Sequence, residues 1–168
     1  MSVWLTEREF RAGASAAQQL TLNVAFLHEI KQDQIELTLI FKEIHNQLGT
    51  PARDPRTLFE ALSQLRDELE TYFALEEFYG YFQSAMTSHP AISQRADRLK
   101  SQHESLYVQI CDLVEKAEGI LYGELPCAKT WQSIALGYDL FLLAFKQHEQ
   151  QEMELMLMLC NDELGVGD

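Results

Sequence analysis

Six residues of types that bind transition metals fall on or beside stretches that otherwise read as apolar core. They are His28, Tyr72, Glu76, His103, His148 and Glu152. Two pairs are four residues apart, Tyr72 with Glu76 and His148 with Glu152. Side chains at this spacing stack on one face of a helix about 6 Å apart, so each pair can present two ligands together. Imidazole and carboxylate ligands from several helices predict a first-row transition-metal site, best matched by two iron ions with bridging carboxylates.

Proline and glycine divide the chain into the elements that must position these residues. Asp54 and Pro55 are typical of a helix N-cap and first helical position. Residues 48–51, 88–90 and 123–126 contain the other breaks, each with a proline. Few turn residues lie between them, which favours long helices with short connections. The predicted helices span residues 20–48, 55–85, 92–122 and 128–161.

Apolar residues recur at steps of three and four along the last three of these stretches, which is the seam pattern of a left-handed helical bundle. The first stretch is less regular, because His28 shares a second apolar stripe with Ile35 and Leu39. Short connections make neighbouring helices antiparallel. We therefore predict an all-α fold, an up-down-up-down antiparallel four-helix bundle over residues 20–161. Residues 1–19 would form an arm or short helix, and residues 162–168 a tail.

The candidate ligands are predicted to share one layer of this bundle. In an antiparallel pair, residues equidistant from the connection lie level. The midpoint of Glu76 and His103 is 89.5, and that of His103 and His148 is 125.5; both fall on predicted breaks, as does the midpoint of His28 and Tyr72 at residue 50. Buried carboxylates are costly unless neutralised, and a metal would neutralise them. The alternative is that each histidine is a hydrogen-bonded core residue and each glutamate extends to solvent.

Composition and charge argue against several other classes of protein. The 168 residues are 46% hydrophobic, enough for one domain with a core, and carry a formal charge of -13. Such an acidic chain is expected to bind neither nucleic acid nor a membrane surface. Three scattered cysteines, with no signal peptide, favour the cytoplasm. The seams account for the inner faces of the helices only, so the outer faces are free to form an oligomer.

Four segments in order, residues 27–29, 72–77, 102–106 and 148–152, resemble the hemerythrin-like, or HHE cation-binding, domain family. The family pattern is a His on the first helix, His-x-x-x-Glu on the second, His on the third and His-x-x-x-Glu or -Asp on the fourth. The resemblance implies a non-haem di-iron centre, oxo- or hydroxo-bridged, with Glu76 and Glu152 as carboxylate bridges. It also implies binding of, or reaction with, dioxygen, peroxide or nitric oxide, including catalase- or peroxidase-like activity.

Two tyrosines depart from this pattern. Tyr72 replaces the second-helix His, and Tyr107 stands one turn after His103, where the oxygen-carrying hemerythrins have a further His. Tyr72 is interpreted as a phenolate ligand, a nearby phenol or a core aromatic. Gln32, Glu77 and Tyr107 are candidates to support the ligands from outside. The missing His leaves an alternative function open, a helical protein-interaction module with a decayed metal site.

Overall fold

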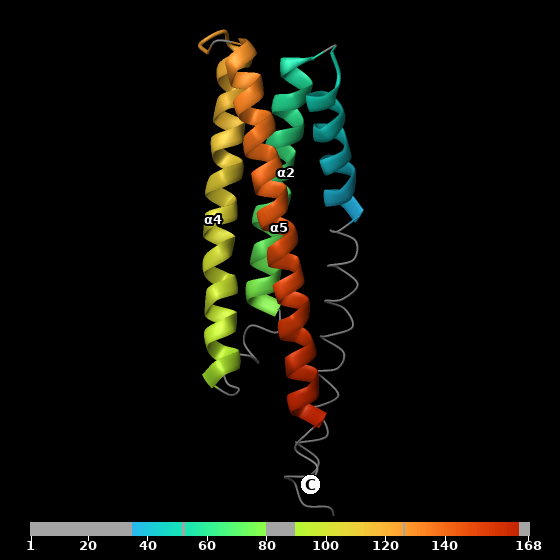
Figure 1. Ribbon diagram of the computed structural model, residues 1–168, viewed down its shortest axis with the longest axis vertical. Helices are drawn as coiled ribbons and strands as arrows, with labels where there is room; N and C mark the ends of the chain where they lie inside the picture. Colours follow the sequence, from blue (N-terminus) through green and yellow to red (C-terminus); the bar gives the residue numbers. More distant parts are fainter. Residues whose placement is uncertain (1–34, 52, 80–89, 126, 165–168) are drawn as a thin grey trace, which may run out of the picture.

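The computed structural model describes residues 35–51, 53–79, 90–125 and 127–164 (Figure 1). Within these ranges all regular structure is helical, with no strand. The helices are residues 35–49, α2 (Pro55–Tyr79), α4 (Pro90–Leu121) and α5 (Cys127–Leu164). The all-α prediction is confirmed for this part of the chain. The predicted arm over residues 1–19, and residues 20–34 of the first predicted helix, lie outside the described residues.

The start of α2 follows from its capping residues. Asp54 accepts hydrogen bonds from the backbone N–H groups of Arg56 at 3.2 Å and Thr57 at 3.2 Å, which would otherwise lack a partner in the first turn. Pro55 then occupies the first helical position, where its missing N–H costs nothing. The hydrogen bonds to Thr57 and Arg56 also lower the pKa of Asp54. The predicted N-cap is therefore confirmed.

The end of α4 is fixed by Gly123, which adopts a positive φ of 74°. The Gly123 N–H bonds to the carbonyl of Ile120 at 3.1 Å, and the Glu124 N–H bonds to that of Gly119 at 2.8 Å. This pair of bonds is the Schellman arrangement, which needs a left-handed residue after the last turn. Glycine adopts that conformation without strain. The helix therefore ends within a residue of the predicted boundary.

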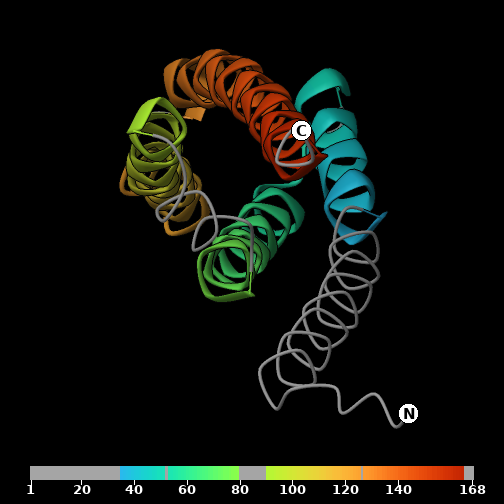
Figure 2. The same cartoon turned by 90° about the horizontal axis from the view of Figure 1, so that it is seen from below.

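Helix α4 packs against both α2 and α5. Seen along the bundle, the three helices surround a common centre (Figures 1 and 2). The apolar residues at the predicted steps of three and four are mostly buried where these helices face one another. The larger apolar cluster includes Leu65, Leu69, Ile110 and Phe141. A smaller cluster lies further along the bundle and consists of Ala96, Leu99, Leu155 and Leu159. Between the two clusters, in seam order, come the buried histidines and glutamates.

The segment 35–49 joins the larger cluster through one side only. Leu37, Ile40 and Ile44 are buried there. Ile35 and Leu39, which share the predicted stripe of His28, are instead 51% and 60% exposed. That second stripe therefore does not face the core where it is described. None of the helices in the described ranges has an apolar stretch long enough to cross a membrane.

Candidate metal centre

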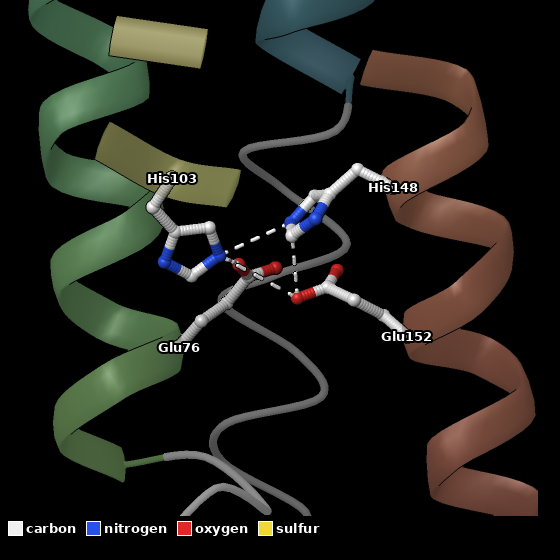
Figure 3. A group of neighbouring side chains, drawn as sticks. All are labelled: Glu76, His103, His148 and Glu152. Atoms are coloured by element: carbon white, nitrogen blue, oxygen red, sulfur yellow. Dashed lines mark hydrogen bonds and ion pairs between the residues drawn. The ribbon is translucent and has the colours of Figure 1, made fainter. Parts of the chain in front are cut away.

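Four buried side chains from three helices converge on one point of the bundle (Figure 3). Glu76 comes from α2, His103 from α4, and His148 and Glu152 from successive turns of α5. Each is at most 4% exposed. One nitrogen or oxygen of each lies within 4.8 Å of the others. The predicted layer of Glu76, His103, His148 and Glu152 is therefore present.

The separations match the edges of one metal coordination shell. The Nε2 atoms of His103 and His148 are 3.1 Å apart. Nε2 of His103 lies 3.3 Å from Oε2 of Glu76, and Nε2 of His148 lies 3.3 Å from Oε1 of Glu152. With ligand bonds of about 2.1 Å, neighbouring ligand atoms lie about 3.0 Å apart in an octahedral shell and about 3.4 Å apart in a tetrahedral one. Nε2 of His103 lies further from Oε1 of Glu152, at 3.7 Å, and all four ligand atoms lie within 4.8 Å of one another. The four residues therefore form a group that could hold a metal ion after small side-chain adjustments.

The outer nitrogen of His103 is held by a carboxylate. Its Nδ1 lies 3.0 Å from Oε1 of Glu77. The other carboxylate oxygen of Glu77 pairs with Nζ of Lys100 at 3.0 Å. Partial burial raises the pKa of Glu77, but bonds from His103 and Lys100 outweigh this and lower it. An ionised carboxylate only accepts hydrogen bonds, so Nδ1 of His103 is the donor.

The outer nitrogen of His148 is held by an amide instead. Its Nδ1 lies 2.9 Å from Oε1 of Gln102, whose Nε2 donates to Oε1 of Gln151 at 3.2 Å. An amide oxygen is an acceptor, so Nδ1 of His148 also carries a hydrogen. In the neutral form, both imidazoles then direct the lone pair of Nε2 toward the centre. That is the tautomer that a metal ligand requires.

A proton competes with a metal for this centre. Burial alone would lower the pKa of His103, but hydrogen bonds to Glu152, Glu76 and Glu77 raise it to about 9. Burial raises the pKa of Glu76 above its ordinary value; the bond to His103 opposes this, and repulsion by Glu152 adds to it. The buried carboxylates are therefore stable as anions only beside a cation, which is a proton on His103 in the absence of metal.

Aromatic rings enclose the cluster on the side of α2. Phe73 stacks on the His103 ring at a centroid distance of 4.2 Å, and it lies nearly perpendicular to the His148 ring at a centroid distance of 5.9 Å. Tyr72, one turn before Glu76, is buried and packs against Phe145 at 6.3 Å. Burial, and then the charges of Glu76 and Glu152, raise the pKa of Tyr72 well above that of a free phenol. The rings therefore form an apolar wall beside the cluster.

The remaining predicted residues divide into two groups. His28 and Gln32 lie outside the described residues. Glu77 was predicted to support a ligand, and its carboxylate accepts the hydrogen bond from Nδ1 of His103. Tyr107 is half-buried and lines the groove between α2 and α4. Whether Tyr72 coordinates a metal stays a prediction.

Sequence reasoning did not predict the contacts of Gln102 and Phe73 with the histidines, or the ion pair between Lys100 and Glu77. Gln102 and Phe73 are each next in sequence to a predicted ligand, so adjacency was an available signal. It was not decisive, because Glu104 also adjoins His103 and is exposed. Lys100 stands three residues before His103, on the same side of α4.

Comparison of the chain with models of known protein families, with curated proteins and with solved structures finds no match. Function is therefore inferred from the geometry of the cluster.

Proposed function

We propose that this protein is a hemerythrin-like non-haem iron protein that binds, or reacts with, dioxygen, peroxide or nitric oxide. The observation that carries the proposal is the convergence of two Nε2 lone pairs and two carboxylates on one buried point. A hard-to-borderline ligand set of imidazole and carboxylate suits iron among the transition metals. Iron held there would supply the redox chemistry for small oxidising ligands.

The described residues have defined tasks in this proposal. His103 and His148 donate neutral nitrogen ligands, oriented by Glu77 and Gln102. Glu76 and Glu152 supply the negative charge that balances the cation. Phe73 limits the access of water to the His103 ring. The histidine proton must leave when a cation binds, so binding releases protons.

A second iron would have its ligands on the other side of the two carboxylates. The position of Tyr72 supports this role, because it lies one turn before Glu76 and is buried beside the cluster. We propose that Tyr72 and His28 complete the second site, with Glu76 and Glu152 as bridges. The proposed first site depends on neither of them.

The up-down-up-down antiparallel topology belongs to the same proposal. Contacts between α4 and α5 support it. Arg95 near the start of α4 pairs with Glu154, whereas His103 further along α4 meets His148, which is earlier in α5. The partner number falls as the α4 number rises, as expected for antiparallel neighbours.

Metal analysis tests the proposal most directly. Protein produced in iron-supplemented medium would be analysed by mass spectrometry and absorption spectroscopy, beside a His148→Gln variant. We expect bound iron and near-ultraviolet charge-transfer absorption in the parent protein, and loss of both in the variant. Fe(II), Mn(II) and Zn(II) added separately to chelator-treated protein would rank the metals by affinity.

The alternative, a helical interaction module with a decayed site, makes the opposite prediction. Its surface candidate is the outer face of α5, where Leu136, Leu140 and Leu143 are exposed. In that case no metal would bind. The His148→Gln variant would then keep the thermal stability of the parent protein, with or without a chelator.

A further inference from the structure

The two histidines of the candidate centre differ in what holds their outer nitrogens. His103 donates to a carboxylate that is in turn paired with a lysine, whereas His148 donates to a neutral amide. A carboxylate that accepts from a ligating imidazole increases the basicity of the opposite nitrogen more than an amide does. The two ligands are therefore chemically unequal, although both are buried on the same layer.

We propose that Glu77 is a positioning residue for His103, that Lys100 holds Glu77 in place, and that this Lys100–Glu77–His103 chain makes His103 the stronger of the two imidazole ligands. The inference rests on the proposed metal-binding function and deepens it. Neither Glu77 nor Lys100 has an atom in the four-residue cluster, so both act through His103.

The geometry gives each member of the chain one task. Glu77 uses its two carboxylate oxygens separately, Oε1 for Nδ1 of His103 and Oε2 for Nζ of Lys100, both at 3.0 Å. This division holds the carboxylate between a buried imidazole and an exposed ammonium group on the same helix, α4. Glu77 itself is only 29% exposed, so its orientation is restricted by packing as well.

Lys100 has two opposing effects on the affinity of the centre for a cation, so its substitution shows which effect is larger. Removing its positive charge would by itself raise the affinity of the centre for a cation, through simple Coulombic attraction. Losing the restraint on Glu77 would lower that affinity, because His103 would no longer be fixed in the metal-binding orientation. The proposal requires that the second effect is the larger.

The hydrogen bond to His103 can be tested without any metal. Long-range proton–nitrogen NMR of imidazoles reports which ring nitrogens carry hydrogen. In chelator-treated parent protein we expect Nδ1 of His103 to carry a hydrogen in slow exchange with water. In Glu77→Leu the exchange should become faster. An unprotonated Nδ1 in the parent protein would overturn the proposal, whether or not the protein binds metal.

Metal affinity tests the consequence. Co(II) is the probe, because its visible spectrum reports both binding and coordination number. We expect Glu77→Gln to weaken Co(II) binding by roughly tenfold or more. Lys100→Met should weaken it severalfold in the parent protein and have no effect in the Glu77→Gln background, since Lys100 acts through Glu77.

Lys116→Met is the matched control. Lys116 also lies on α4 and also pairs with a carboxylate, that of Asp112 at 2.6 Å, but away from the cluster. This variant should leave Co(II) affinity unchanged. An increase in affinity for Lys100→Met, or the same change in both backgrounds, would overturn the positioning role. If the parent protein itself binds no Co(II), the proposed function fails, and the NMR result still decides the hydrogen bond.

Discussion

His103 and His148 face each other with their Nε2 atoms 3.1 Å apart, while their Nδ1 atoms bond to separate acceptors on opposite sides. Two neutral imidazoles in this arrangement would direct lone pairs at each other. The arrangement is favourable only when a cation lies between the nitrogens, either a proton or a metal ion.

Replacing one buried carboxylate should separate metal affinity from stability. In Glu76→Gln, metal affinity is expected to fall by about a hundredfold, because a charged ligand is lost. Without metal the variant should be at least as stable as the parent protein, since the cost of burying the Glu76 charge and its repulsion by Glu152 are both removed. Thermal melts with chelator and with metal measure both effects. Glu104→Gln, at an exposed position of α4, is the control and should change neither.

The stability of the chelator-treated protein should fall as pH rises from about 6.5 to 9. The pKa of His103 is raised from 6.5 to about 9, so the folded protein holds a proton in that interval that the unfolded chain has lost. More protons bound to the folded state make the unfolding free energy decrease with pH. The raised pKa of Glu76 acts in the same direction at lower pH.

Added metal should reverse this trend. Because a metal ion must displace the proton, its stabilising effect grows as pH rises through the pKa of His103. The measurement is the melting temperature at several pH values with chelator and with a fixed metal concentration. A difference between the two curves that stays constant with pH would contradict proton–metal competition at His103.

Tyr72→Phe should remove the second iron and leave the first. The phenol of Tyr72 is buried and hydrogen-bonded to Glu76, whereas the proposed first site takes its ligands from Glu76, His103, His148 and Glu152. We expect the iron content to fall from two ions per chain to one, with loss of a broad visible band that arises from phenolate coordination to ferric iron. Metal analysis and absorption spectra of the two proteins measure this. Two irons in the variant would show that Tyr72 is an aromatic core residue.

The smaller apolar cluster should contribute strongly to the free energy of unfolding, because its side chains are buried. Leu155 is fully buried there against Leu99. Leu155→Ala should lower the free energy of unfolding by about 2–5 kcal/mol, through lost transfer energy and the remaining cavity. Leu157, two residues later and 60% exposed, provides the control. Leu157→Ala should change stability by less than about 0.5 kcal/mol. Chemical denaturation of both variants distinguishes the two cases.

The sequence by itself determined the helices, their buried faces and one polar layer. Periodic apolar residues and the caps at Asp54 and Gly123 are local signals, so helix positions could be predicted closely. A helix has a fixed rise per residue, so distances from the breaks predicted that Glu76, His103 and His148 would lie level. The exposed Ile35 and Leu39 mark the limit, because two apolar stripes on one helix do not reveal which faces the core.

Only the tertiary structure decided how each ring nitrogen is used. Gln102 and Glu104 both adjoin His103 and look equivalent in sequence, yet Gln102 bonds to His148 while Glu104 is exposed. Glu77 reaches His103 although 26 residues separate them. Such contacts depend on the rotation of each helix about its axis and on side-chain rotamers. Both are set by packing across the bundle, which no local spacing encodes.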